Sequence, residues 1–506
     1  MKAKFLSGLA LLALVTTLTG CTPDKPKSSA TGESRTETSK SEATSGASEK
    51  EEYTDPKALK NEYDVVIVGA GGAGLTAAIS AKEAGANPVI LEKMPIAGGN
   101  TLKASAGMNA SETKVEEANG IQDSNDLFYE ETLKGGGGTN NKELLRYFVD
   151  NSASAIDWLD QHGIVLNNLT TTGGMSVSRT HRPSDGSAVG GYLVNGLLEN
   201  VGKLKIPIFV NADVTKIHTD KSGKVDGVEV TVKDTEKHTI QSKAVVVTTG
   251  GFGSNKEMIE KYKPELKGYV STNHAGATGD GIQMIENLGG AVVDMEQIQI
   301  HPTVEQENAY LVSEAVRGEG AILVSSNGER FFNEMETRDK VSAAINALDE
   351  KSAYLIFDQG VRDRAKAIDT YVKKGFVIEG KTMAELAKKA DLPEKNLEET
   401  VNTWNQAVTE KKDTLGRTTA MDNKLEKGPF YAIKIAPGIH HTMGGVVINT
   451  QTEVLKKDGK AIPGLYAAGE VTGGLHGGNR IGGNAVADIV IFGRQAGNVS
   501  AKYVEK

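Results

Sequence analysis

The sequence lacks the residues that build cross-linked or haem-bearing proteins. Its 506 residues include a single cysteine, Cys21, so an internal disulfide is excluded, and no C-x-x-C-H segment offers a c-type haem site. The net charge of −9 lacks the basic excess of nucleic-acid-binding proteins, so we expect no nucleic-acid partner, and no motif predicts a metal site. Aromatic residues make up only 5%, whereas the 58 glycines indicate tight turns and close backbone approaches to a ligand.

Long apolar runs are also missing beyond the N-terminus. Lys2 and Lys4 precede an apolar run over residues 5–15, which is too short to span a bilayer and ends in Leu-Thr-Gly-Cys21. This ending resembles the bacterial lipobox. We therefore expect residues 1–20 to be a lipoprotein signal peptide and Cys21 to carry a lipid that anchors the protein to the cell membrane on its extracellular face. The alternative is an incidental cysteine after an ordinary cleavage site.

Residues 22–52 contain no aliphatic residue larger than alanine and no aromatic residue. Such a segment cannot bury a core, so a disordered Ser/Thr-rich tether is predicted over residues 21–60. Within it, Glu42-Ala-Thr-Ser-Gly-Ala-Ser48 resembles the site at which bacterial flavin transferases attach FMN through a phosphoester. Glu42 stands where Asp is usual and Ser48 where Thr is usual. The resemblance implies covalent FMN at Ser48, and an ordinary flexible linker is the alternative.

The first strong motif begins with an apolar run over residues 65–68. It leads into G-x-G-x-x-G at Gly69, Gly71 and Gly74, followed by an Ala-rich helix. Gly69 permits the tight turn, Gly71 lets the backbone approach a pyrophosphate, and Gly74 lets the helix pack close to the strand. A second apolar strand ends at Glu92, 18 residues after Gly74, where a carboxylate can hold adenosine ribose hydroxyls. The motif predicts a dinucleotide but does not choose between FAD and NAD.

Two further segments carry a more specific resemblance. Gly98-Gly-Asn-Thr101, with residues 104–109, and the run over residues 462–485 containing Glu470 are similar to the flavin-binding segments of the fumarate reductase and succinate dehydrogenase flavoproteins. Over residues 63–503 the chain most resembles the soluble flavocytochrome c-type fumarate reductases and their relatives acting on urocanate and acrylates. The resemblance implies the extracellular, haem-less lipoprotein form of Gram-positive bacteria. It implies FAD, bound non-covalently because no histidine lies between Pro95 and Ala110.

The resemblance also implies which residues hold FAD. These come from both ends of the chain: Gly69, Gly71, Ala73, Gly74, Glu92, Asn100, Thr101, Ala106, Gly107, Val214, Asp280, His441, Glu470, Ala485 and Val486. The implied fold class is α/β. It has a discontinuous Rossmann-like FAD-binding domain, residues 61–296 and 437–506, and an inserted α+β clamp (capping) domain, residues 297–436.

The middle of the chain holds the polar residues that a small dicarboxylate needs. The substrate-binding residues that the resemblance implies are Ala106, His301, Ser313, Glu314, His440 and Arg480. Arg480, supported by His440, can make a planar two-point contact with one carboxylate, and His301 and Ser313 match positions that hold the other. Ser313 stands where better-known fumarate enzymes have Thr, and the hydroxyl is kept.

Three residues match the catalytic positions of the family. Arg338 matches the proton donor, and Glu314 and Arg317 match the residues that replace its proton from solvent. Arginine, with a pKa of about 12.5–13.8, is a poor acid by itself. The role is reasonable once hydride from FAD N5 has made the neighbouring alkene carbon strongly basic. Glu314 and Arg317 also fit an ordinary helical ion pair three residues apart.

The expected reaction is reduction of fumarate to succinate as a terminal electron sink in anaerobic respiration. The expected electron donor is a membrane quinol, an NADH dehydrogenase or an extracellular flavin carrier, and a flavin transferase is an expected partner. The alternatives are a related 2-enoate reductase acting on urocanate, methacrylate, acrylate or cinnamate, and a flavin-carrying electron-transfer lipoprotein. Gly135–Gly138 is predicted to be a flexible surface loop, because no strand leads into it.

Overall fold

The structure is a computed structural model that describes residues 53–232 and 236–505. The predicted signal peptide, Cys21 and Ser48 lie outside the described residues. The predicted end of the tether, residue 60, is too late. Thr54 pairs with the edge strand at Ile208 through its amide (2.9 Å) and hydroxyl (3.0 Å), and the Tyr53 hydroxyl accepts from the Ala97 amide at 3.0 Å. Within the described ranges, no helix is both long and apolar enough to cross a membrane.

The central element is a parallel sheet around β1 (Val65–Val68), whose four apolar residues are all buried. β1 pairs in parallel with β2 (Pro88–Glu92) on one side and β10 (Ala244–Val247) on the other. The sheet order is β19-β20-β10-β1-β2-β6, in which only the edge strand β19 is antiparallel. The other three strands are β6 (Ile208–Val210), β19 (Glu453–Leu455) and β20 (Ala461–Ala467). The predicted α/β, Rossmann-like fold is confirmed.

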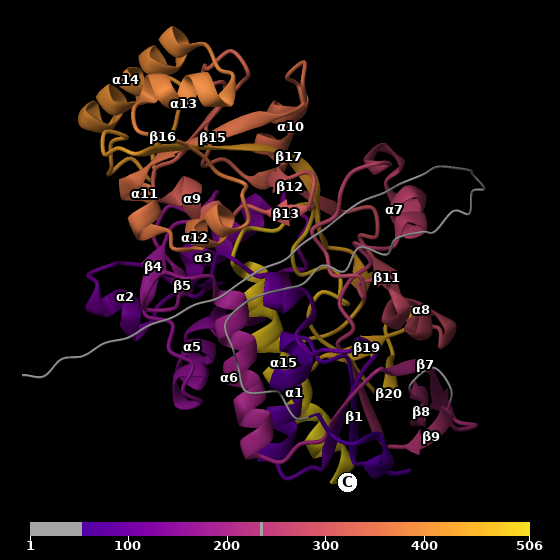
Figure 1. Ribbon diagram of the computed structural model, residues 1–506. Helices are drawn as coiled ribbons and strands as arrows, with labels where there is room; N and C mark the ends of the chain where they lie inside the picture. Colours follow the sequence, from indigo (N-terminus) through magenta and orange to yellow (C-terminus); the bar gives the residue numbers. More distant parts are fainter. Residues whose placement is uncertain (1–52, 233–235, 506) are drawn as a thin grey trace, which may run out of the picture. The chain divides into compact units, whose positions relative to one another are not determined.

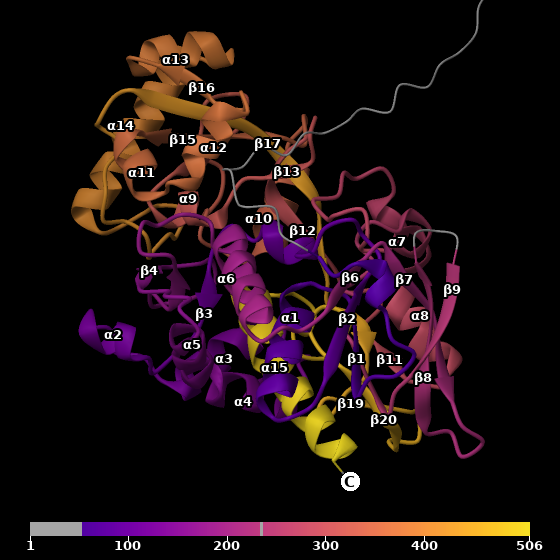
Figure 2. The ribbon, with the colours of Figure 1, turned by 60° about the horizontal axis from the view of Figure 1, so that its bottom comes forward.

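Helices α1 (Gly72–Glu83) and α15 (Asn484–Val504) lie side by side near the centre of Figures 1 and 2. They pack closely because α15 presents glycines to α1. A Cβ on Gly497 would lie 2.2 Å from the Ala77 carbonyl oxygen, and one on Gly493 would lie 2.8 Å from that of Ala73. The C-terminal helix therefore returns to the first dinucleotide-binding unit, as the predicted joining of both chain ends requires.

Shorter elements extend this region. A three-stranded antiparallel sheet follows β6, and a group of helices with a small sheet lies between residues 108 and 203. These elements are β3 (Met108–Asn109), α2 (Lys114–Ala118), α3 (Asn125–Gly135), α4 (Lys142–Asp150), α5 (Ser152–Gln161), β4 (Asn168–Thr170), β5 (Thr180–Arg182), α6 (Val189–Lys203), β7 (Ala212–Thr219), β8 (Val225–Val232) and β9 (Glu236–Gln241). Further short elements are η1 (Pro56–Ala58), η2 (Gly99–Lys103), α7 (Lys256–Tyr262), η3 (Pro264–Leu266), α8 (Asp280–Asn287), β11 (Val292–Val293) and β18 (Gly445–Val446).

A second hydrophobic core is formed by residues between Val312 and Ile435. Its elements, coloured from salmon to gold in Figure 1, are the strands of an antiparallel sheet of order β13-β12-β17-β15-β14, with β16 beside β17, and the helices around it. They are β12 (Ile298–Glu305), β13 (Tyr310–Leu311), α9 (Glu314–Gly318), β14 (Ile322–Val324), α10 (Arg338–Asn346), β15 (Ala353–Asp358), α11 (Gln359–Arg364), α12 (Ala367–Lys373), β16 (Ile378–Gly380), α13 (Met383–Ala390), α14 (Glu394–Glu410) and β17 (Phe430–Thr442). The domain boundaries at residues 297 and 436 stay a prediction.

Strands β12 and β17 connect the two cores. They pair antiparallel from Ile298↔Thr442 to Val304↔Ala436, and the register shifts between Gln299 and Ile300 and again between His301 and Val304. Such bulges re-aim side chains that a regular strand would alternate between two faces. Residues of the candidate site therefore lie on the irregular part of this strand pair.

Candidate active site

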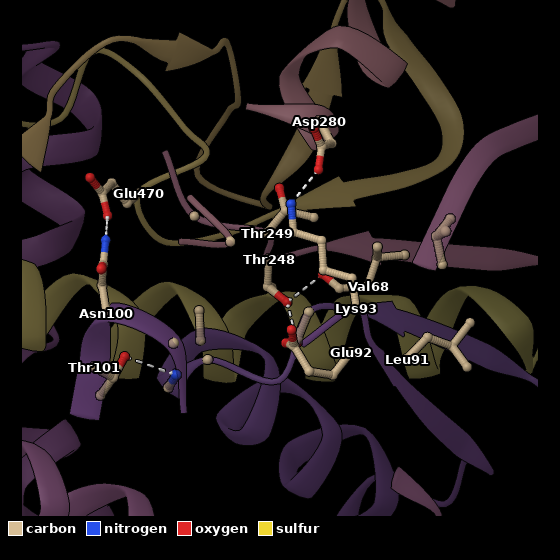
Figure 3. Close-up of a pocket in the computed structure, with 18 of the residues that line it drawn as sticks. Val68, Leu91, Glu92, Lys93, Asn100, Thr101, Thr248, Thr249, Asp280 and Glu470 are labelled. Atoms are coloured by element: carbon tan, nitrogen blue, oxygen red, sulfur yellow. Dashed lines mark hydrogen bonds and ion pairs between the residues drawn. The ribbon is translucent and has the colours of Figure 1, made fainter. Parts of the chain in front are cut away.

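A pocket lies where β1, β2 and β10 end, which is where ligands bind in open α/β sheets (Figure 3). Its cavity volume is about 90 Å³, and the space continues into open solvent. Nine of the predicted FAD residues line it: Gly69, Gly71, Ala73, Glu92, Asn100, Thr101, Val214, Asp280 and Glu470.

The three motif glycines are needed for three different reasons. Gly69 has φ +103°, and a Cβ on it would lie 2.7 Å from the Thr248 carbonyl oxygen. A Cβ on Gly74 would lie 1.9 Å from the Gly69 carbonyl oxygen, so only glycine lets α1 approach the turn. A Cβ on Gly71 would meet nothing within 4 Å, although Gly71 lines the pocket. A side chain at Gly71 would therefore occupy the space in which a pyrophosphate can approach the N-terminus of α1.

One end of the pocket carries Glu92 and Lys93 (Figure 3, right). Glu92 Oε2 accepts from the Ala70 amide and Oε1 from the Met94 amide, each at 2.8 Å. Burial raises the pKa of Glu92, and these two amides offset part of the effect. Lys93, which the sequence reasoning missed, pairs with Asp280 and donates to the Thr278 hydroxyl at 2.6 Å. This end offers a carboxylate for ribose hydroxyls, and Lys93 adds an ammonium that is paired with Asp280.

The opposite end carries Asn100 and Glu470 (Figure 3, left). Asn100 Nδ2 lies 3.3 Å from Glu470 Oε2, and the Thr442 amide donates to Glu470 Oε1 at 3.0 Å. Burial raises the pKa of Glu470. His441 does not line the pocket but lies against it, with Nδ1 3.4 Å from Glu470 Oε1. Glu470, just after β20, and Asn100, in η2, thus meet across 370 positions of the sequence.

The other predicted FAD residues stay predictions at defined places. Gly74 packs inside the glycine turn, and Ala106 and Gly107 precede β3, where a Cβ on Gly107 would lie 2.4 Å from the His181 carbonyl oxygen. Ala485 and Val486 lie in the first turn of α15. The glycine cradle, the helix N-terminus and the acids at both ends fit the parts of FAD: pyrophosphate, ribose and ribitol hydroxyls.

A buried cluster of charges surrounds Arg338, the first residue of α10. Arg338 Nε and Nη2 donate to Glu314 Oε2 at 3.0 and 2.7 Å, and Arg317 Nη2 lies 3.5 Å from Glu314 Oε1. All three side chains are at most 5% exposed. Burial pushes the pKa of Glu314 upward, but the adjacent Arg338 and Arg317 outweigh it and hold the pKa below its usual value. The structure thus brings together the three predicted catalytic residues, with Glu314 ionised between two guanidinium groups.

Arg480 lies beside this cluster without a carboxylate partner among the described residues. Its Nη1 donates to the Ile481 carbonyl at 3.2 Å, its Nη2 donates to Gln299 Oε1 at 3.1 Å, and its buried Nε has no hydrogen-bond partner in the described part of the chain. Burial and then Arg338 lower the pKa of Arg480 to about 9, so it remains largely protonated at neutral pH. A buried, protonated guanidinium without a carboxylate partner is suited to binding an anion.

Two histidines face the same region, with ring centroids 5.3 Å apart. The Thr303 amide donates to His301 Nδ1 at 3.2 Å, so the neutral ring of His301 carries its proton on Nε2, which has no partner in the described structure. His440 Nδ1 lies 2.7 Å from the Thr272 hydroxyl. Burial, followed by Arg338, lowers the pKa of both histidines well below its usual value. Both are therefore neutral at pH 7 and act as hydrogen-bonding groups.

The hydroxyl of Ser313 is already engaged. It accepts from the Ala315 amide at 3.3 Å as the N-cap of α9 and lies 3.3 Å from the Ser105 carbonyl oxygen. Its predicted contact with a substrate carboxylate requires the hydroxyl to leave Ser105. Ala106, the next residue along, is 8% exposed and places this backbone segment beside the site.

Sequence reasoning missed Gln299, which connects the two halves of the charge cluster. Gln299 Oε1 accepts from Arg338 Nη1 and Arg480 Nη2, both at 3.1 Å, and its Nε2 donates to the Arg480 carbonyl at 2.7 Å. An isolated Gln in an apolar strand gave no signal of this role. The register shift after Gln299 changes the direction in which side chains of this strand point. A regular alternation read from the sequence could not predict that the Gln299 side chain faces both arginines.

The prediction of a flexible surface loop at Gly135–Gly138 is confirmed in part: Gly137 and Gly138 lie in an exposed turn, whereas Gly135 is helical. The flexibility of this turn stays a prediction. Gly135 ends α3, and its carbonyl accepts from Asn479 Nδ2 at 3.1 Å, while the Gly136 carbonyl accepts from the Gly478 amide at 2.8 Å. The glycine run supports the turn that carries Arg480. A Cβ on Gly477 would lie 2.6 Å from the Gly136 carbonyl oxygen, so glycine at 477 lets the two backbones approach.

Residues 64–486 match the FAD binding domain family. The chain belongs to this family and is a fumarate reductase-like flavoprotein. The flavoprotein is 45% identical to a fumarate reductase (cytochrome) of Shewanella frigidimarina over 443 residues, covering 88% of this chain and 78% of that protein. It superimposes on a flavocytochrome c3 fumarate reductase in its open conformation with a TM-score of 0.73 and 41% identity, covering 89% of this chain and 80% of that chain.

The flavoprotein is also 55% identical over 476 residues to an NADH:fumarate oxidoreductase of Klebsiella pneumoniae (strain 342). The match covers 92% of this chain but 51% of that protein, so the flavoprotein spans about half the length of this relative. Family membership therefore establishes an FAD-binding flavoprotein of the fumarate reductase type, and the residues that line the pocket are consistent with that cofactor.

Proposed function

We propose that this flavoprotein reduces fumarate to succinate. One observation carries the proposal: Arg338, hydrogen-bonded to the ionised Glu314, lies next to Arg480, a buried guanidinium with no carboxylate partner among the described residues. A dianion bound to Arg480 would neutralise this charge and lie against Arg338. Arg480 would thus hold fumarate, and Arg338 and Glu314 would supply the proton for its reduction.

Each residue contributes a distinct step. Arg480 and the neutral rings of His301 and His440 bind and orient the two carboxylates. FAD, when held by Glu92, Asn100 and Glu470, would supply the hydride for one alkene carbon. Arg338 donates a proton to the other carbon, which completes the addition of two electrons and two hydrogens to fumarate.

The cluster can return a proton to Arg338, and Arg317 then takes a replacement proton from solvent. Glu314 lies between Arg338 and Arg317, so a proton can pass from Arg317 through the Glu314 carboxylate to Arg338. Burial and then Arg338 lower the pKa of Arg317, although Glu314 offsets part of the effect, and this favours proton release from Arg317. Gly482 lets the Glu314–Arg338 pair approach the turn that carries Arg480, because a Cβ there would lie 2.3 Å from Glu314 Oε2.

The test is turnover by the purified chain without residues 1–52, using reduced viologen as the electron donor. Fumarate should be reduced much faster than urocanate, methacrylate, acrylate or a cinnamate. Faster turnover of one of these monocarboxylates would identify the related 2-enoate reductase instead. No turnover with any of them, and no perturbation of the FAD spectrum by dicarboxylates, would favour an electron-transfer protein.

Electron supply and location are part of the same proposal. The lipid on Cys21 would hold the protein on the extracellular face of the cell membrane, and FMN on Ser48 would pass electrons to FAD from a membrane quinol, an NADH dehydrogenase or an extracellular flavin carrier. The lipobox-like segment that ends at Cys21 supports the lipid anchor, and the segment over residues 42–48, which resembles a target site of flavin transferases, supports the FMN. Co-expression with a flavin transferase should add the mass of FMN, and Ser48→Ala should abolish that addition. Acid denaturation of the chain without residues 1–52 should release all of its FAD.

A further inference from the structure

The short helix α9 carries both Glu314 and Arg317, and by itself it is a weak support. It has five residues, which is little more than one turn, and isolated helices of that length are unstable in water. Arg317 also has a long side chain that loses much rotational freedom when it is fixed. The 3.5 Å separation of Arg317 Nη2 from Glu314 Oε1 therefore depends on contacts from outside α9.

Two outside contacts hold Arg317 at its two ends. The Glu334 carbonyl oxygen accepts from Arg317 Nη1 at 2.5 Å, which fixes the guanidinium. The backbone carbonyl of Arg317, at the C-terminal end of α9, accepts from Arg417 Nη2 at 2.9 Å in addition to the Gly320 amide at 3.1 Å. A cationic donor at this place satisfies a helix-end carbonyl and interacts favourably with the helix dipole.

Arg417 is itself held firmly. It is 1% exposed, and it also donates to the carbonyls of Ala321 (2.9 Å), Thr419 (3.1 Å) and Ala420 (2.7 Å) and to Glu334 Oε2 (3.2 Å). Its guanidinium lies over the Trp404 ring, 4.5 Å from the centroid. Burial pushes the pKa of Glu334 upward, but hydrogen bonds from Arg330 outweigh this, so the pKa stays below its usual value. Glu334 therefore remains an anion that anchors Arg417.

We propose that Arg417, anchored by Glu334, is a positioning residue for proton delivery. It caps α9 and keeps Arg317 in line with Glu314, although it touches neither substrate nor FAD. This inference rests on the proposed reductase function. Its consequence is that the loop after α14, far from Arg338 in sequence, sets the rate of reprotonation.

Arg330 provides a matched control. It makes a two-point contact with the same Glu334 carboxylate (2.7 and 2.8 Å) and lies 4.8 Å from the centroid of the same Trp404 ring. Its other hydrogen bonds go to Asp413, and none within the described residues goes to Arg317. Arg330→Gln should therefore damage the same part of the clamp core without disturbing α9. A purely structural role for Arg417 predicts that Arg417→Gln and Arg330→Gln behave alike.

The experiment measures kcat and KM for whichever enoate the wild type reduces, the melting temperature, FAD content and the rate at which reduced FAD reduces ferricyanide, which needs no proton from Arg338. Arg417→Gln should lower kcat at least tenfold, with KM within threefold and the ferricyanide rate unchanged. Arg330→Gln should keep kcat within threefold despite a comparable loss in melting temperature. Arg417→Lys should be intermediate, because a single ammonium cannot reach all the carbonyls that the guanidinium reaches.

The inference is overturned if Arg417→Gln keeps more than half of the wild-type kcat, or loses no more than Arg330→Gln does. If Arg417→Gln does not fold, Arg417→Lys decides: a kcat at least threefold below wild type with unchanged KM supports the inference, and a smaller loss overturns it. A wild type that reduces no enoate would instead overturn the proposed function, and the inference with it.

Discussion

At the scale of single residues, Arg338 and Arg480 are both buried guanidinium groups, yet their partners give them different roles. Arg338 is bound to Glu314, through which a lost proton can return, whereas Arg480 has no carboxylate partner among the described residues. Arg338→Ala should keep FAD and bind fumarate but lose at least about a thousandfold in kcat, roughly 4 kcal/mol of transition-state stabilisation. Arg480→Ala should raise KM strongly as well, because it removes a ground-state contact.

Steady-state fumarate reduction with reduced viologen, measured across pH for both variants and the wild type, separates these effects. If Arg338→Ala retained more than about a tenth of wild-type turnover, a loss under 1.4 kcal/mol, Arg338 would not be the acid. A neutral His301 or His440, each holding a ring proton, would then be the next group to examine.

Gln299 matters because one oxygen serves two arginines. Gln299→Leu leaves a donor of Arg338 and a donor of Arg480 unpaired in a buried site, and each unpaired donor costs about 1–3 kcal/mol. We expect kcat/KM to fall about 10- to 100-fold, with both kcat and KM affected. Gln297→Leu is the control, since the side chain of Gln297 reaches Glu296 and neither arginine. Equal activity of the two variants would show that Gln299 does not set the arginine geometry.

At the scale of elements, the site depends on how closely α15 packs against α1. Gly497→Ala would place a Cβ 2.2 Å from the Ala77 carbonyl oxygen, and a backbone atom inside a helix cannot yield cheaply. We expect a loss of about 1–3 kcal/mol in the free energy of unfolding, together with weaker FAD retention, since α15 begins beside the pocket.

Gly191 in α6 offers the opposite case. A Cβ there meets nothing within 4 Å, so Gly191→Ala should stabilise the protein by about 0.5–1 kcal/mol through the higher helix propensity of alanine. Thermal and denaturant unfolding of both variants test the pair. Two alanine variants with equal stability would contradict the close packing of α1 against α15.

At the scale of the whole molecule, six of the nine histidines have a lowered pKa, and burial is the largest cause for each: His181, His274, His301, His440, His441 and His476. The folded protein resists protonation of these rings, while the unfolded chain accepts protons near pH 6.5. Their contribution to stability is therefore present above pH 6.5 and is lost as pH falls towards the folded pKa values.

Three buried carboxyl groups, Glu92, Glu116 and Glu470, act in the opposite direction because their pKa values are raised, that of Glu116 to about 7. Their stabilising effect is present below about pH 4.5 and is lost as pH rises. With more histidines than carboxyl groups involved, the free energy of unfolding should fall by at least about 1 kcal/mol from pH 6.5 to 5.5. Urea unfolding at a series of pH values measures this change. A free energy of unfolding that stays constant or increases as pH falls from 6.5 to 5.5 would contradict the buried, neutral histidines.

Much of the nucleotide site followed from the sequence alone. The residues of β1, the glycine turn and Glu92 are local, so strand, turn, helix and acid could be placed by spacing, and the structure puts them at one pocket. The order of the polar residues from His301 to Arg480 supported a charge cluster through family resemblance. Local propensity and motif spacing are sufficient where neighbours in sequence are also neighbours in space.

Only the tertiary structure decided the rest. Gln299 joins Arg338 to Arg480 because a bulge re-aims its strand, Asn100 reaches Glu470 across 370 positions of chain, and Arg417 caps a helix that begins about a hundred residues before it. Gly135 and Gly136 accept hydrogen bonds from the turn that carries Arg480, which motif spacing did not indicate. Such contacts depend on strand register and on which elements pack together, and neither is encoded in the spacing of residues along one segment.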